Sequence, residues 1–530
     1  MNSKAKILTI VIISLLVGIA IGMFEMPNHG IITTKNSSEK ASKLSDILQL
    51  ISDDYVDAVN LDTLTDEAIK SLLAQLDPHS VYLTAAEVKS ENEHLNGNFE
   101  GIGIQFRIVE DTIVVIQPIK GGPSNRVGIM AGDRIVRIND TLRVGKELET
   151  EQVMRLLKGK KGSKVKLSIK RNGLERLVDF TVTRDVIETH SVDFYGMIDK
   201  TTGYIKLSQF SSTSYKEVVQ ALSALKYDHD MQQLIFDLRG NGGGYLNEAI
   251  AIADEFLPKG DLIVFTKGRP NSKPNKSFAT KGGLFEKGKL IILIDEVSAS
   301  ASEILAGAVQ DNDRGMIIGR RTFGKGLVQD QISLSDGSAL RLTIARYYTP
   351  SGRCIQRPYV SNDPEQYYMD FIARYANMET NSDTIPHADS LRYKTKNGRY
   401  VFGGGGIEPD IELPYSAYKR SETCIKLLRL GLTYQFCFDF ADTFRETLNQ
   451  FSDGDDFLAN FQVSNTIWQS FNEFAAKHNV KIKSLSAKEQ AQVRTMIKAY
   501  IAQLIFDDQS FYRLFITVDE DVQTAIQYFK

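Results

Sequence analysis

The stretch LIILIDEVSASASEILAGAV, residues 290–309, decides the fold of this chain. It begins with five residues that are all leucine or isoleucine, a pattern typical of a buried strand. Ile304, Leu305 and Val309 then recur at helical spacing, so a helix is expected to follow. Ser300 therefore lies where a strand turns into a helix, and helix N-terminal amides beside it can stabilise developing negative charge.

Ser300 has two interpretations. Ser300 and Glu303 fit a Ser-x-x-Glu capping box, which stabilises a helix start and needs no chemistry. Lys325 favours chemistry, because it lies between two glycines in TFGKG, residues 322–326, an unusual place for a merely solvated charge. A lysine accepts a proton near neutral pH only if burial lowers its pKa from near 10.4 by about three units. We predict a Ser300 nucleophile with Lys325 as its base, held through a hydrogen bond to Gln329.

Other catalytic arrangements receive less support. None of the seven histidines stands beside a strand-turn-helix serine or in a metal-binding motif. A Ser-His-Asp triad stays open, since triad members can be distant in sequence, but a Ser-Lys pair is the simpler hypothesis. This chemistry requires no metal and no organic cofactor.

The segment 290–329 resembles the signature of the carboxyl-terminal processing peptidases, or tail-specific proteases, of peptidase family S41. The resemblance implies that Ser300 is the nucleophile, Lys325 the general base and Gln329 the residue that orients the base. It also implies a multidomain α/β fold whose protease core is distantly similar to crotonase/ClpP-like folds. Asp311 matches a recurrent family position, although a structural role at a helix end is the simpler interpretation.

A second family element is LIFDLRGNGGG, residues 234–244, an apolar strand that runs into a glycine-rich turn. Glycine lets backbone amides approach a ligand closely. The resemblance implies that Gly243 or Gly244 supplies one amide of an oxyanion hole and that Ala301 supplies the other. A tight strand–helix connection is the alternative. A phosphate-binding loop is disfavoured, because its Lys-Ser/Thr ending is missing.

Residues 98–185 resemble a PDZ domain, notably in GIGIQF at 101–106 and GIMAGDRI at 128–135. A PDZ domain adds an extended peptide to a sheet edge and receives the terminal carboxylate on loop amides. A plain β-rich packing module is the alternative. The residues implied in peptide binding are Gly101, Ile102, Gly103, Ile104, Phe106, Val153 and Leu156.

The amino terminus places Lys4 and Lys6 before an almost wholly apolar stretch, residues 7–24, which is about long enough to cross a bilayer. This pattern predicts a signal anchor with a cytoplasmic tail at 1–6. A cleaved signal peptide is the alternative, although the stretch ends without a clear small-x-small cleavage site. We expect the rest of the chain to lie in the periplasm, anchored to the inner membrane.

Composition supports a chain of several domains. The 530 residues, 42% of them hydrophobic, can bury more than one core. The formal net charge of −3 argues against nucleic acid as a partner, despite the basic stretch at 158–164. Only three cysteines occur, so disulfides do not build the fold, but Cys424 and Cys437 either pair or remain buried thiols.

The predicted segments beyond the span are a linker and helical region, the PDZ domain, the protease core and a helical carboxyl-terminal domain. Their ranges are 25–97, 98–185, 186–416 and 417–530. Apolar residues such as Val493, Ile497 and Ile501 fall on one helical face of the last segment. That face packs within its own domain, forms a homo-oligomer contact or docks an adaptor.

These features together predict a periplasmic serine endopeptidase that processes or degrades proteins bearing accessible apolar carboxyl-terminal tails. A catalytically silent PDZ scaffold at the membrane is the alternative from another class. Acyl-CoA chemistry on a crotonase-like core is a third hypothesis, which the amino-terminal export segment opposes because acyl-CoA is cytoplasmic.

Overall fold

The computed structural model describes residues 38–109, 111–145, 148–280, 282–361, 363–377, 389–414 and 420–529. The chain divides into two compact units, residues 1–72 and residues 73–530. The predicted tail at 1–6 and span at 7–24 lie outside the described residues. Across the ranges given above, no helix is both long and apolar enough to cross a membrane.

The first unit is helical where it is described. It contains α2 (Ser38–Asp54) and most of α3 (Leu61–Ala74), whose end, from Leu73, belongs to the second unit. Both helices lie in the predicted amino-terminal helical region. That region also contains β1 and α4, which belong to the second unit and are described with it below.

The predicted protease core is built on a six-stranded sheet in the order β10-β11-β12-β15-β16-β21. All neighbouring strands are parallel except β10 and β11, which are antiparallel. The strands are β10 (Val192–Met197), β11 (Thr202–Leu207), β12 (Gln233–Asp237), β15 (Lys289–Ile294), β16 (Met316–Gly319) and β21 (Ile411–Glu412). Helices cover both faces, so central strands such as β15 are apolar on both sides, and this explains the unbroken apolar run that precedes Ser300.

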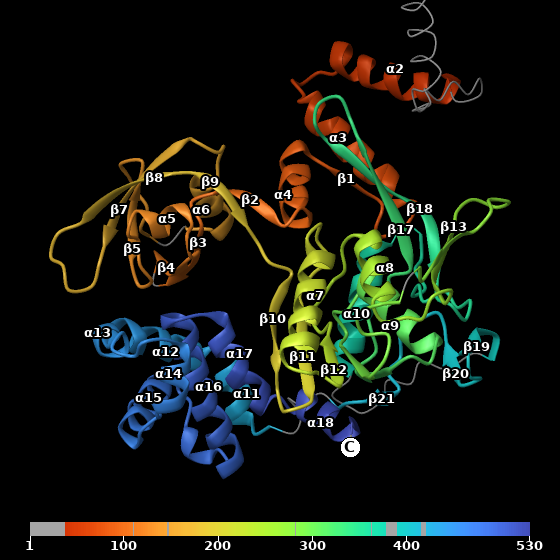
Figure 1. The fold of residues 1–530 in the computed structure, drawn as a ribbon. Coiled ribbons are helices and arrows are strands. Elements are labelled where there is room, and N and C mark those ends of the chain that lie inside the picture. Colours follow the sequence, from red (N-terminus) through yellow and green to blue (C-terminus); the bar gives the residue numbers. More distant parts are fainter. Residues whose placement is uncertain are drawn as a thin grey trace, which may run out of the picture. The chain divides into compact units, whose positions relative to one another are not determined.

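Different helices cover the two faces of this sheet. One face packs against α7 (Ser214–Ser223), α8 (Leu246–Asp254) and α9 (Ala301–Asp311). The other face packs against residues from α17 (Asp508–Val518) and α18 (Glu520–Phe529), the last two helices of the chain. Figure 1 shows α18 next to the core strands, at the carboxyl terminus. The end of the chain is therefore packed on the six-stranded sheet.

A second sheet adds a long hairpin to the core. Its members are β1 (Val81–Leu83), β13 (Leu262–Lys267), β14 (Asn275–Phe278), β17 (Leu327–Ser333) and β18 (Ala339–Tyr348). β1 pairs with β18. The predicted helical region at 25–97 therefore also contains a strand, which belongs to this second sheet. Smaller elements around this sheet are α4 (Ala85–Leu95), α10 (Pro364–Asn377), β19 (Arg392–Lys394) and β20 (Tyr400–Phe402).

The predicted PDZ domain forms its own sheet and apolar core. Its elements are β3 (Ile104–Val109), β4 (Thr112–Pro118), α5 (Pro123–Arg126), β5 (Arg134–Ile138), β6 (Thr141–Leu142), α6 (Thr150–Leu157), β7 (Lys164–Lys170) and β8 (Val178–Thr183). The entering strand β2 (Asn98–Gly101) pairs with the leaving strand β9 (Asp185–Glu188). This pairing closes the domain near the predicted boundaries at 98 and 185.

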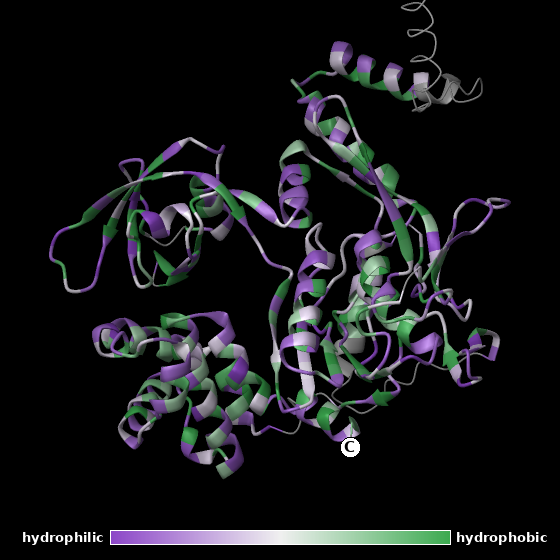
Figure 2. Cartoon of the chain, in the orientation of Figure 1, coloured by the Kyte–Doolittle hydropathy of each residue, from purple (hydrophilic) through white to green (hydrophobic). Residues whose placement is uncertain are grey.

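The carboxyl-terminal region is helical, as expected. Before α17 come α11 (Glu422–Arg429), α12 (Leu432–Thr443), α13 (Arg445–Leu448), α14 (Gly454–Asn460), α15 (Asn465–Lys477) and α16 (Ala487–Ile505). Figure 2 shows hydrophobic and hydrophilic residues alternating along these helices, as expected for helices that bury one face. Cys424 and Cys437 are free thiols, both buried, and Cys437 lies near the Ile497 carbonyl on α16. The apolar face of α16 thus packs within this domain.

Candidate active site

Ser300 lies at the junction between β15 and α9, as the sequence predicts, and caps the start of α9. Its backbone has φ 55° and ψ −111°, an uncommon conformation for a residue other than glycine. Such a conformation costs on the order of 1–3 kcal/mol and persists only where the surroundings impose it. The preceding turn supplies that constraint, since the Ala299 amide donates to the Asn241 carbonyl and the Ser298 hydroxyl donates to the Leu238 carbonyl.

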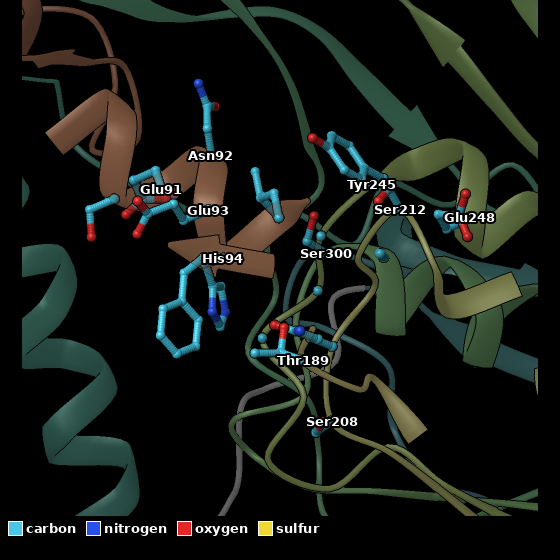
Figure 3. Close-up of a pocket in the computed structure, with 18 of the residues that line it drawn as sticks. Glu91, Asn92, Glu93, His94, Thr189, Ser208, Ser212, Tyr245, Glu248 and Ser300 are labelled. Carbon is cyan, nitrogen blue, oxygen red and sulfur yellow. The ribbon is translucent and has the colours of Figure 1, made fainter. Parts of the chain in front are cut away.

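Ser300, Lys325 and Gln329 line one cavity of about 1580 Å³. Figure 3 shows Ser300 and Tyr245 of the core among the residues around it. The cavity wall includes backbone from the glycine-rich turn and from the predicted PDZ loop. The structure therefore brings together groups that are separated widely in the sequence.

Lys325 is held by a chain of hydrogen bonds. Its Nζ donates to Gln329 Oε1 at 2.9 Å, and Gln329 Nε2 donates to the backbone carbonyl of His79. Burial lowers the pKa of Lys325, and the positive charge of Arg341 lowers it further. Within the described part of the chain, no hydrogen bond joins Lys325 to Ser300, although both line the cavity.

His79 has a local role, consistent with its place in the segment before the PDZ domain. Its ring lies 3.3 Å from the Tyr367 hydroxyl, and its backbone N–H donates to Asp77. Burial lowers the pKa of His79 to about 4, and Lys325 adds to this effect. The imidazole is therefore neutral at physiological pH and acts near the site through its backbone.

Glu303 combines the capping role with a second one that the sequence reasoning missed. Its carboxylate accepts hydrogen bonds from the backbone N–H of Ser300 at 2.8 Å and of Lys325 at 2.9 Å. It also accepts from the Gly324 amide at 2.8 Å and the Thr322 hydroxyl at 2.5 Å. One buried side chain therefore connects the turn that carries Ser300 to the loop at 322–326 that carries Lys325. The Ser-x-x-Glu spacing predicted the helix cap, but it gave no indication of the contacts that Glu303 makes with residues 322–325.

Burial raises the pKa of Glu303 to about 7, and its hydrogen bonds act in the opposite direction. All four of its partners are donors, so the ionised carboxylate is the form that fits this site.

The glycine-rich turn lies directly against Ser300. Gly243 has φ 105°, and a Cβ at this position would lie 2.9 Å from the Cβ of Ser300. The Gly243 amide is already engaged, because it donates to Asn241 Oδ1 at 2.9 Å. Among the described residues, the amides of Gly244 and Ala301 donate to no protein group.

Asn241 connects the two turns and was also missed from the sequence. Its side chain is fully buried, and its Nδ2 donates to the Leu207 carbonyl. Its carbonyl accepts from the Ala299 amide and from the Ser302 hydroxyl. Asn241 thus connects the glycine-rich turn to residues on both sides of Ser300 in the sequence, Ala299 and Ser302.

Asp311 lies away from the cavity wall. It is buried at the end of α9, where it accepts hydrogen bonds from Arg353 at 2.8 Å and from the Ser351 amide at 3.0 Å. This placement favours the structural interpretation of Asp311.

The peptide-binding residues expected from the PDZ resemblance separate into two groups. Those that line the cavity are Gly101, Ile102, Gly103, Ile104 and Phe106. The structure differs on α6, where Val153 is fully buried in the domain core and Leu156 packs against that core. Met154 and Leu157 of the same helix line the cavity instead. Leu157 belongs to the same core cluster as Val153, so one face of α6 contributes to both the domain core and the cavity wall.

Comparison with known families agrees with this architecture. Residues 201–365 match peptidase family S41, and residues 101–182 match the PDZ domain family. Residues 25–87 match the N-terminal domain of the activating protease CtpB, and residues 423–507 match a family of unknown function.

Curated relatives extend these matches over most of the chain. Carboxy-terminal processing protease CtpA of Bacillus subtilis is 33% identical over 411 residues, which are 75% of this chain and 87% of the relative. Carboxy-terminal-processing protease of Bartonella bacilliformis is 36% identical over 325 residues, 61% of this chain and 74% of the relative.

The solved structure of a photosystem II D1 C-terminal processing protease is 26% identical and covers 70% of this chain and 86% of its own, with a TM-score of 0.36. The expected family and the mixed α/β multidomain fold are confirmed by the family matches and the curated relatives. The chain therefore belongs to peptidase family S41 and is a serine peptidase that carries a PDZ domain.

Proposed function

We propose that this peptidase uses a Ser300–Lys325 dyad to cleave proteins that present accessible apolar carboxyl-terminal tails. The observation that carries the proposal is the shared cavity, in which Lys325 has a lowered pKa and is oriented by Gln329. A lysine that loses its proton more readily than usual is suited to act as a general base. The alternative of a silent PDZ scaffold loses support, because both side chains are present in a peptidase family.

The proposed reaction begins with neutral Lys325. Its Nζ accepts the proton of the Ser300 hydroxyl while Oγ bonds to the carbonyl carbon of the substrate peptide. The carbonyl oxygen becomes an oxyanion. The protonated lysine then gives its proton to the leaving amine as the peptide C–N bond breaks. Water hydrolyses the resulting acyl-enzyme, with Lys325 again accepting a proton.

We assign the oxyanion hole to the amides of Ala301 and Gly244. Both amides are without a protein acceptor among the described residues, whereas the Gly243 amide is occupied by Asn241. Preorganised donors of this kind are worth about 10²–10³-fold in kcat. Gly243 then has a steric role: it lets the glycine-rich turn pack against Ser300, because a side chain at this position would collide with Ala299 and Ser300.

Substrate selection is assigned to the PDZ domain. Its loop at 101–103 and the first residues of β3 line the same cavity as Ser300. A tail added along β3 would have its carboxylate at the loop and its preceding residues directed toward the core. Two relatives are named as carboxy-terminal processing proteases, which supports this substrate class.

The periplasmic location and the membrane anchor rest on the apolar stretch at 7–24 and the lysines before it. A second copy of the chain or an adaptor protein remains part of the proposal as a partner.

The substrate proposal is tested with the full chain in detergent. One unstructured protein ending in apolar residues is compared with the same protein ending in two aspartates. We expect kcat/KM to be about tenfold or more higher for the apolar tail, since the groove is apolar and receives only one terminal carboxylate. Equal kcat/KM for both tails would contradict the assignment.

A matched pair of variants on β3 locates the effect. Ile104→Glu, at the cavity, is expected to remove the preference for the apolar tail, whereas Gln105→Glu, exposed on the same strand, is expected to retain it. Cleavage of a short chromogenic peptide serves as the control for an intact catalytic site.

A further inference from the structure

Two arginines lie behind the active-site turns, outside the cavity wall. Arg239 stands in the glycine-rich turn, and Arg320 stands two residues before Thr322 in the loop that carries Lys325. Their side chains are largely buried, and both contact the start of α18, the last helix of the chain. The site is thus connected to a segment about 200 or more residues away in sequence.

Asp521 is the residue shared by these arginines. Its Oδ2 lies 3.1 Å from Arg239 Nη1 and 3.3 Å from Arg320 Nη1. Each arginine has further carboxylate partners: Arg239 pairs with Asp237 at 2.6 Å and Asp519 at 2.8 Å, and Arg320 pairs with Glu296 at 2.8 Å. Among these contacts within the described residues, Asp521 alone joins the two arginines.

The helix that carries Asp521 is firmly placed. Val522, Ala525 and Phe529 of α18 are buried in the same cluster as Ile235 of β12 and Ile291 of β15. The Asp521 side chain is only 12% exposed, so its charge is poorly solvated and depends on its partners. Its position is therefore fixed relative to the strands that lead into both turns.

Short paths of backbone connect each arginine to the reacting groups. Arg239 is two residues from Asn241, whose carbonyl accepts from the Ala299 amide next to Ser300. Arg320 is two residues from Thr322, whose hydroxyl donates to Glu303 beside the Lys325 amide. Because Asp521 contacts both arginines, it limits the movement of the backbone that leads to Asn241 and of the backbone that leads to Thr322.

We propose that Asp521 is a positioning residue for the peptidase reaction. From α18, it holds the glycine-rich turn and the Lys325 loop at 322–326 in their positions relative to each other. The proposal rests on the Ser300–Lys325 assignment above. Loss of its charge leaves two buried guanidinium groups with fewer partners, and removal of one partner from a buried ion pair is strongly unfavourable. Small displacements of catalytic groups lower the rate steeply.

The test compares Asp521→Asn with Glu520→Gln in the full chain. Glu520 is the neighbouring carboxylate on the same helix, and it pairs with Lys488, which is exposed. For a short chromogenic peptide, we expect Asp521→Asn to lower kcat by between about tenfold and a hundredfold with KM changed less than about twofold. Glu520→Gln is expected to retain the parent kcat, and Asp521→Glu to recover part of it. An unchanged kcat in Asp521→Asn would overturn the proposal.

A second readout separates positioning from folding. A fluorophosphonate labels the reactive serine covalently, so the labelled fraction measures folded protein and the rate constant measures the reactivity of Ser300. We expect Asp521→Asn to lower the rate constant by the same factor as kcat. A parent rate constant with a smaller labelled fraction would show a purely structural role and overturn the proposal.

Two controls keep the outcomes distinct. If Asp521→Asn does not fold, Arg320→Lys takes its place, because it retains the charge but loses the two-sided contact with Glu296 and Asp521. Slower labelling supports the proposal, and the parent rate overturns it. Lys325→Met is run in parallel: parent-like labelling there refutes the dyad, whatever Asp521 variants do.

Discussion

Ser300→Ala and Lys325→Ala are each expected to lower kcat for peptide hydrolysis by about 10⁴-fold or more. In the proposed reaction, the first change removes the atom that bonds to the substrate, and the second removes the base that takes its proton. The two losses should not add in the double variant, because the residues act as one unit. Initial rates with a chromogenic peptide measure all three variants.

Exposed residues of the same types provide the controls for this experiment. Ser333→Ala and Lys276→Ala change side chains outside the cavity and are expected to retain parent rates. Substantial activity in Lys325→Ala would show that another group accepts the serine proton.

Glu303→Gln is expected to lower kcat by about 100-fold, the second largest effect. The amide retains one acceptor oxygen but directs an NH₂ group at N–H or O–H donors of Ser300, Lys325, Gly324 or Thr322. The Ser300 turn and the Lys325 loop then lose some of the hydrogen bonds to Glu303 that connect them. Glu87→Gln is the matched control, because Glu87 occupies the equivalent position of an exposed capping box on α4. Its kcat should equal that of the parent.

The pKa of Glu303 gives this prediction a pH signature. Burial raises the pKa in the fold from 4.5 to about 7, so the folded state binds this proton more tightly than the unfolded chain does. The contribution of Glu303 to the free energy of unfolding is therefore present below pH 4.5 and lost as pH rises through about 7. Activity should change in the opposite sense, because the ionised carboxylate is the form that accepts all four donors.

In Glu303→Gln, the effect of Glu303 ionisation on both stability and activity near pH 7 should be absent. Urea titrations measure the free energy of unfolding, and initial rates measure kcat, at pH values on either side of 7. A parent enzyme whose kcat is flat between pH 6 and 8, about one unit either side of that pKa, would contradict the assigned role.

Local patterns in the sequence predicted the local parts of the site. Ser300 stands between an apolar strand and an amphipathic helix, and both signals fall within twenty residues, so its place at a strand–helix junction could be read directly. Lys325 was proposed from its place between two glycines and Gln329 from its spacing four residues on, and the family resemblance agreed with both. Gly243 and Gly244 were both plausible oxyanion donors, because the bond from the Gly243 amide to Asn241 exists only in the folded turn.

Contacts between distant segments could not be predicted in this way. The His79 carbonyl that holds Gln329 is 250 residues from it, and Asp521 is 282 residues from Arg239. Periodicity describes which face of an element is apolar but not which element covers it. On α6, Val153 packs in the domain core while Met154 and Leu157 line the cavity, because spacing alone does not say which residues of a helix reach a groove.

The most direct test of the mechanism is the pH dependence of Ser300 labelling by a fluorophosphonate, measured by mass spectrometry for the parent and Lys325→Met. The proposed dyad predicts labelling at Ser300 alone, at a rate that rises with pH as Lys325, whose pKa is lowered by burial, loses its proton. Lys325→Met should be labelled about 10³-fold or more slowly, and only the change caused by Glu303 near pH 7 should remain in its pH profile. Equal rates and equal pH profiles in the two proteins would contradict a Ser–Lys dyad.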